Sequence, residues 1–131
     1  MSLEDNKAIV RRWFAETDQG NDAIIDELCA PDAIDHNSPV PDVPPGSAGV
    51  RRANAVLRAA FPDTRHTIED QIAEGDKVVT RLRARATFRS AFLGIPPTGQ
   101  PLEIGGIAIH RLADGKLVEH WGNVDALSFM Q

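Results

Sequence analysis

The chain has 131 residues, of which 42% are hydrophobic and 25% charged, which is typical of one globular domain able to enclose a small cavity. Its formal net charge of −5 argues against a nucleic-acid partner, and no run of about 18 apolar residues could cross a membrane. The single cysteine, Cys29, cannot form an internal disulfide and no secretion signal opens the chain, so we expect a cytoplasmic domain over residues 1–131.

Three helices are expected in the first half of the chain. Apolar side chains recur at helical spacing in three segments, over residues 4–19, 22–29 and 47–61. Gly20-Asn21 separates the first two helices, and Pro31 breaks the second. A short extended piece is predicted over residues 33–37. The following segment, 38–46, holds four of the nine prolines and is expected to be a loop.

From residue 64 apolar and polar side chains alternate, which is typical of β-strands. The predicted strands cover residues 64–73 and 77–92, followed by a proline-rich loop, 94–99. A C-terminal hairpin, 100–125, turns at Asp114-Gly115, a dipeptide that favours tight hairpin turns. Helices followed by antiparallel strands predict an α+β domain in which the helices cover one side of a strongly curved sheet.

Side chains capable of chemistry are concentrated in the C-terminal hairpin. His110 lies on the strand face whose small and apolar residues should line a cavity. From strand alternation we expect Trp121 and Asp125 to share that cavity with His110. His120 and Arg111 should then face away from it. The hairpin therefore predicts an acid/base site on a concave sheet face.

A series of short motifs runs along nearly the whole chain, from Ala8 to Asp125. These motifs are Trp13-Phe14, Asp35-His36-Asn37, Phe61-Pro62-Asp63, Gly75 to Val79, Gly94 to Gly99, Arg111 to Lys116, and Glu119-His120-Trp121 with Asp125. In their order and spacing the chain resembles the SnoaL-like polyketide cyclases of the nuclear-transport-factor-2-like (NTF2-like) superfamily, also called predicted ester cyclases.

This resemblance implies a cone-shaped α+β barrel that forms a homodimer through the outer face of its sheet. It also implies cofactor-free, intramolecular aldol ring closure of an aromatic polyketide ester, which is a hydrophobic small molecule. By order and spacing, Asp125 would be the acid/base of that reaction, supported by His110 and Asn37. Two positions depart from the family pattern, because Ala108 stands where characterised cyclases have Gln and Phe88 where many relatives have His.

Each catalytic candidate also has a structural interpretation. A carboxylate beside Trp121 and apolar walls would lose hydration, which raises its pKa and suits Asp125 to acid/base work. Alternatively, Asp125 caps the short tail that follows, residues 126–131. His110 either transfers a proton and orients a carbonyl, or is a core histidine bonded to the backbone.

The candidates for substrate binding likewise have two interpretations. His36 and Asn37 precede the proline-rich segment and either bind substrate oxygens or hold that loop in place. The aromatic side chains that form either a pocket wall or ordinary core are Trp13, Phe61, Phe88 and Trp121. His66 opens a strand and is expected to be exposed.

The four histidines are scattered without metal-ligand spacing, so no metal is expected. The chain has no GxGxxG, Walker or GxSxG motif, and the resemblance implies cofactor-free chemistry, so no other cofactor is expected either. The leading hypothesis is a cofactor-independent enzyme that applies acid/base chemistry to a hydrophobic, carbonyl-bearing small molecule. The alternatives are a ketosteroid-isomerase-like or hydroxylase-like relative, and a non-catalytic module that binds a small molecule.

Overall fold

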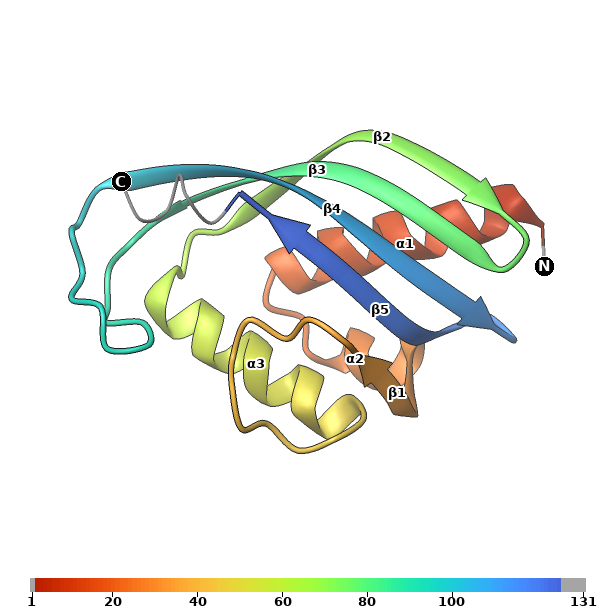
Figure 1. Ribbon diagram of the computed structural model, residues 1–131, viewed down its shortest axis with the longest axis horizontal. Coiled ribbons are helices and arrows are strands. Elements are labelled where there is room, and N and C mark those ends of the chain that lie inside the picture. Colours follow the sequence, from red (N-terminus) through yellow and green to blue (C-terminus); the bar gives the residue numbers. More distant parts are fainter. Residues whose placement is uncertain (1, 126–131) are drawn as a thin grey trace.

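The computed structural model describes residues 2–125, so the predicted tail over residues 126–131 lies outside the described part of the chain. Three helices and five strands follow one another (Figure 1). Their bounds are α1 (Leu3–Asp18), α2 (Ala23–Leu28), β1 (Cys29–Asp35), α3 (Ser47–Ala60), β2 (Arg65–Glu74), β3 (Lys77–Thr87), β4 (Pro101–Ala113) and β5 (Lys116–Val124).

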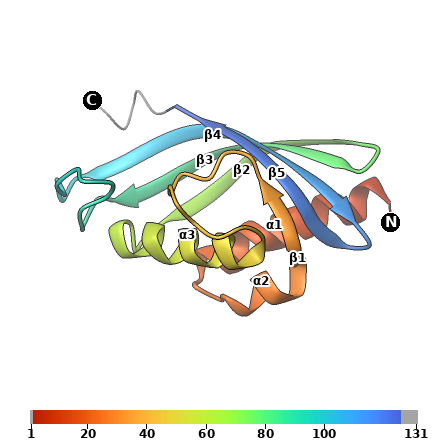
Figure 2. The same cartoon turned by 60° about the horizontal axis from the view of Figure 1, so that its bottom comes forward.

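The five strands form one curved sheet in the order β1-β5-β4-β3-β2. The three helices lie on one face of this sheet, its concave face, and leave the convex face uncovered (Figures 1 and 2). The predicted α+β architecture, with helices on one side of a strongly curved sheet, is therefore confirmed. β1 and β2 are the two edges of the sheet, which is thus an open cone and not a closed barrel.

One strand departs from the antiparallel arrangement expected from the sequence. β1 pairs with β5 in parallel, whereas every other neighbouring pair is antiparallel. The strand begins at Cys29, directly after α2, and includes the piece predicted over residues 33–37 up to Asp35. The chain enters this strand directly from α2, and after Asp35 it leaves the sheet through the segment that leads to α3. The result is that residues 29–35 lie beside residues 117–120.

The core lies between the helices and the concave face of the sheet. Val10 of α1 packs against Val78 of β3 and against Leu112 and Leu117 of the β4–β5 hairpin. A second cluster is built by α2 and the start of β1, and consists of Ile24, Ile25, Leu28 and Cys29. Each such side chain contributes roughly 1.5–3 kcal/mol when it is removed from water. Trp13 packs against both clusters, which matches the core interpretation of this residue.

The lone cysteine is buried in the second cluster and is not in a disulfide. Burial raises the pKa of the Cys29 thiol to about 11, so it stays protonated at neutral pH. No helix within residues 2–125 is long and apolar enough to cross a membrane.

The proline-rich segment 36–46 arches from the end of β1 back to the start of α3 (Figure 2). It is packed tightly where it returns, because a Cβ added at Gly46 would lie 2.1 Å from the carbonyl oxygen of Pro31. A Cβ at Gly49 would lie 1.9 Å from the carbonyl oxygen of Pro44. Only glycine fits at these two positions, so the arch and β1 are fixed against each other.

Candidate functional site

The β4–β5 hairpin brings His110 and His120 together. The two residues are direct cross-strand partners, and their ring centroids are 4.8 Å apart. Trp121 pairs with Ile109 and therefore lies on the convex face. The prediction that Trp121 shares the cavity with His110, and that His120 faces away, is wrong.

A β-bulge is the physical reason for this reversal. Next to the turn, Leu112 pairs with Leu117, and unbroken pairing would then place Glu119 opposite His110. Val118 is instead left without a partner, so Arg111 pairs with Glu119 and His110 with His120. One inserted residue moves every later side chain of a strand to the other face.

The same shift separates Asp125 from His110. Asp125 follows the end of β5, where its amide donates to the carbonyl oxygen of Gly105 at 2.9 Å. By alternation it belongs with Trp121 on the convex side, and five extended residues place it about 16 Å along the strand from His120. The structure therefore does not bring together the predicted acid/base pair of Asp125 and His110.

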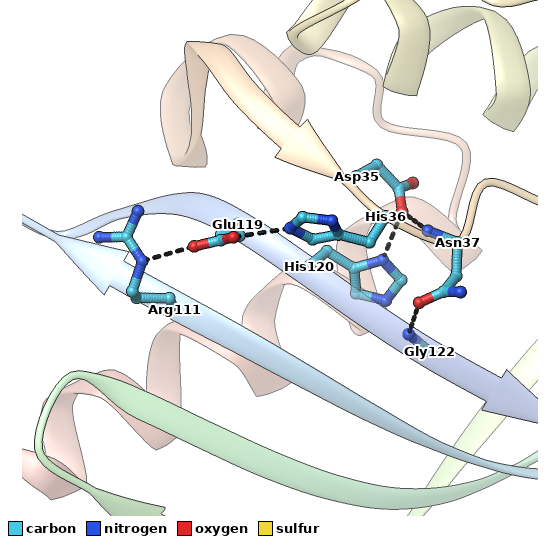
Figure 3. Close-up of polar contacts among 7 residues, drawn as sticks. All are labelled: Asp35, His36, Asn37, Arg111, Glu119, His120 and Gly122. Atoms are coloured by element: carbon cyan, nitrogen blue, oxygen red, sulfur yellow. Dashed lines mark hydrogen bonds and ion pairs between the residues drawn. The ribbon is translucent and has the colours of Figure 1, made fainter.

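A different carboxylate occupies the place next to His120. Asp35 of β1 is the register partner of His120 in β5, and its Oδ1 lies 2.9 Å from Nδ1 of His120 (Figure 3). The backbone amide of Asn37 donates to the same oxygen at 3.0 Å. Asp35 belongs to the motif Asp35-His36-Asn37, but the sequence alone indicates no role for it.

The protonation state of this pair follows from its hydrogen bonds. Burial alone would raise the pKa of Asp35, but the bond and charge of His120 and the amide of Asn37 together hold that pKa below its usual range. Asp35 is therefore a carboxylate at neutral pH and can only accept. The hydrogen bond to a carboxylate places a proton on Nδ1 of His120, so Nε2 is the ring nitrogen that can act as a base.

Gly122 leaves room for the His120 ring. A Cβ at this position would lie 3.1 Å from Cε1 and 3.2 Å from Nε2 of His120. The amide of Gly122 also donates to Oδ1 of Asn37 at 3.1 Å. No residue between 2 and 125 forms a hydrogen bond with Nε2 of His120, so this nitrogen is available to a ligand on the concave side.

His110 completes the concave cluster as a neutral group. Only 4% of its surface is exposed, and its buried Nδ1 has no hydrogen-bond partner within the described residues. Burial, assisted by the neighbouring charge of His120, lowers the pKa of His110 to about 3. His110 can therefore give or accept a hydrogen bond at physiological pH without carrying charge.

His36 and Asn37 are occupied by contacts within the protein. His36 lies on the convex face, where its ring stacks on Trp121 with centroids 4.9 Å apart and planes 8° from parallel. Its Nε2 lies 2.6 Å from Oε2 of Glu119 (Figure 3). Asn37 holds β5 through the amide of Gly122, so both residues fasten β1 and the proline-rich arch to the sheet.

A cavity of about 500 Å³ lies between β1, the proline-rich arch and the start of α3. This volume is within the range of sites that bind small molecules. Most of its wall is apolar, and Asp35 is one of two carboxylates in it. The lining residues are Pro31, Asp32, Ala33, Ile34, Asp35, Ser38, Val43, Pro44, Pro45, Gly46 and Gly49.

The aromatic candidates for the pocket wall lie elsewhere. Phe61 and Phe88 pack on each other with ring centroids 5.1 Å apart, and neither lines this cavity. His66, expected to be exposed, is partly buried, with Nδ1 2.6 Å from Oδ1 of Asp18. A second hollow of about 170 Å³ lies at the hairpin turns, away from the histidines. Residues 2–125 contain no cluster of three or more metal-binding side chains.

Comparison with known protein families identifies the family of this chain. The family model for SnoaL-like polyketide cyclases matches residues 8–131. The chain belongs to this family. No curated protein sequence matches the chain.

Solved structures extend the SnoaL-like assignment to the fold. TsrD from Streptomyces laurentii is 26% identical with a TM-score of 0.87, over 98% of this chain and 94% of TsrD. IdmH from Streptomyces antibioticus, a candidate polyketide cyclase, is 32% identical with a TM-score of 0.82, over 95% of each chain. AclR from Streptomyces galilaeus, a candidate hydroxylase, is 28% identical with a TM-score of 0.84, over 98% of this chain and 95% of AclR. These structurally similar proteins are thus named for different reactions. The reaction of this chain must therefore be inferred from the residues of its own site.

Proposed function

We propose that this protein is a cofactor-independent enzyme that uses acid/base catalysis on a hydrophobic, carbonyl-bearing small molecule. The reaction that fits best is intramolecular aldol-type cyclisation of a polyketide ester. One observation carries the proposal: Asp35 links a largely apolar cavity of about 500 Å³ to His120, and His120 lies beside the buried, neutral His110.

The first step is removal of a proton from the carbon next to a carbonyl group. Nε2 of His120 takes this proton, and Asp35 stabilises the imidazolium that forms, because its carboxylate accepts the Nδ1 hydrogen bond. The electron pair moves onto the carbonyl oxygen as an enolate. The buried, uncharged ring of His110 lies beside His120 and keeps this side of the base free of water.

The second step closes the ring. The enolate carbon attacks a second carbonyl of the same molecule, so that one carbon–carbon bond forms and the second carbonyl oxygen becomes an alkoxide. The proton held on Nε2 of His120 then passes to this alkoxide. The proton is returned and nothing is oxidised or reduced, so substrate and product have the same mass and no cofactor is required.

The cavity supports an uncharged, hydrophobic substrate. Its walls are mainly proline, valine, isoleucine and alanine side chains, and its charged groups, Asp32 and Asp35, are both carboxylates. A free acid would be repelled by these groups, whereas an ester would not.

Incubation with a panel of aromatic polyketide methyl esters, followed by liquid chromatography and mass spectrometry, tests this proposal. We expect a cyclised product of unchanged mass that His120→Ala and Asp35→Asn fail to form. Tight binding of the esters without such a product would contradict catalysis and favour a binding module.

We also propose that two copies pair through the convex face. Ile72, Val79, Ile109 and Trp121 are successive cross-strand neighbours and form an apolar row on that face, with Ile72 62% exposed. Light scattering should give twice the chain mass of 14.2 kDa, and Ile72→Asp should give the single mass. Leu3→Asp, at an exposed apolar residue outside the sheet, is the control. A single mass for the unaltered protein would refute this pairing.

A further inference from the structure

β1 is joined to β5 over only a short stretch where it carries Asp35: Ile34 pairs with Glu119, Asp35 pairs with His120, and the amide of His36 donates to the carbonyl oxygen of His120 at 3.0 Å. Its register with β5 is interrupted between Cys29 and Ile34, and Pro31 has no amide to donate. Ile34, Asp35, His36 and Asn37 are all exposed, so burial holds this stretch only weakly. The position of Asp35 opposite His120 must therefore depend on specific contacts around it.

The shortest of these contacts lies on the convex face. Glu119 accepts a hydrogen bond from Nε2 of His36 at 2.6 Å and another from Nε of Arg111 at 2.8 Å. The Glu119 side chain is only 17% exposed, and these two bonds hold the pKa of Glu119 below its usual range. Because a carboxylate only accepts, the proton of the His36 ring lies on Nε2. The stack on Trp121 then fixes the plane of that ring.

The two histidine–carboxylate pairs are reciprocal. On the concave face β1 supplies the carboxylate, Asp35, and β5 supplies the histidine, His120. On the convex face β1 supplies the histidine, His36, and β5 the carboxylate, Glu119 (Figure 3). The members of each strand are adjacent in sequence, so the two pairs lie on opposite sides of the same two strands.

This arrangement couples the pairs through the backbone. The Cα atoms of Asp35 and His36 are about 3.8 Å apart across one rigid peptide unit. A slip of β1 by one residue would break both pairs at once. Any movement of β1 that releases His36 from Glu119 therefore also displaces the carboxylate of Asp35 from His120.

We propose that His36, held by Glu119 and Trp121, is the positioning residue of the Asp35–His120 pair. It acts from the convex face and does not touch the substrate. Its effect on turnover rests on the proposed function, whereas its effect on the tautomer of His120 does not.

The experiment compares the imidazole nitrogen NMR signals of His120 in the unaltered protein and in matched variants. His36→Phe keeps an aromatic ring to stack on Trp121 but removes the donor to Glu119. His36→Gln keeps an N–H donor. Glu103→Gln is the control, because it weakens another convex-face ion pair, with Arg83 at 3.0 Å, away from β1.

We expect His120 to hold its proton on Nδ1 in the unaltered protein and to show both tautomers in His36→Phe. Turnover of the ester panel should fall about 10- to 100-fold in kcat with KM unchanged, because the base is misplaced while the cavity is intact. His36→Gln should restore most of both readouts, and Glu103→Gln should match the unaltered protein.

A single Nδ1 tautomer in folded His36→Phe would overturn the proposal. An equal change of His120 in Glu103→Gln would overturn it as well, because the effect would then not be specific to β1. If His36→Phe does not fold, Glu119→Leu provides the same test, because it removes the acceptor for Nε2 of His36. If His120 responds as expected but no protein turns over the esters, the positioning role holds and the proposed function fails.

Discussion

Asp35 and His120 face each other across the parallel strands β1 and β5, with Oδ1 and Nδ1 2.9 Å apart although 85 residues separate them in the chain. Asp35 also lines the cavity, and the ring of His120 lies 4.8 Å from that of His110. This contact therefore connects the space for a ligand to the groups that can move a proton.

The lowered pKa of His110 predicts an acid-sensitive fold. The unfolded chain takes up a proton on this residue below pH 6.5, whereas the folded protein does not until about pH 3. Stability therefore falls as pH is lowered from 6.5 toward 3, by about 1.4 kcal/mol per pH unit for one proton. His110→Leu should remove this component, so urea unfolding at pH 7 and pH 4.5 should show a smaller difference for the variant. An identical pH dependence in both proteins would show that His110 is not buried as a neutral ring.

Gly122→Ala should impair catalysis more than folding. The new Cβ would lie 3.1–3.2 Å from two atoms of the His120 ring, so the ring must shift slightly and its alignment with Asp35 is disturbed. We expect kcat to fall about tenfold, since small displacements of a catalytic group have large effects on rate. Gly105→Ala is the matched control, because a Cβ there meets nothing within 4 Å. Equal kcat values for the two variants would argue against a role for the His120 ring.

Filling the cavity should weaken substrate binding. Val43 is one of the wall residues of the 500 Å³ cavity, and Val43→Trp adds a large ring to the cavity that Asp35 also lines. KM for the ester panel should rise about tenfold or more. Ile95→Trp, at an exposed apolar position between β3 and β4, is the control and should leave KM unchanged. An unchanged KM in Val43→Trp would mean that the substrate binds elsewhere.

The general architecture could be read from the sequence because it depends on local periodicity. Helical spacing in the first half and alternation from residue 64 onward are properties of neighbouring residues, and they predicted the α+β fold correctly. The pairing of His110 with His120 could not be predicted in this way. It depends on the bulge at Val118, which changes the face of every later residue of β5 and has no marker in the sequence.

Asp35 was missed for a related reason. Its role comes from the parallel pairing of β1 with β5, a contact between distant parts of the chain that local patterns do not encode. The motif Asp35-His36-Asn37 does lie at the candidate site. However, successive side chains of β1 point to opposite faces of the sheet, so its members have different partners. Asp35 faces His120 on the concave side, and His36 faces Glu119 on the convex side.

The most direct test of the acid/base assignment compares two variants in the ester cyclisation assay. His120→Ala should lower kcat about 10²- to 10⁴-fold, the usual contribution of a positioned general base, while Asp125→Asn should retain the activity of the unaltered protein. The opposite result, with His120→Ala active and Asp125→Asn inactive, would contradict the site described here and return the catalytic role to the end of β5.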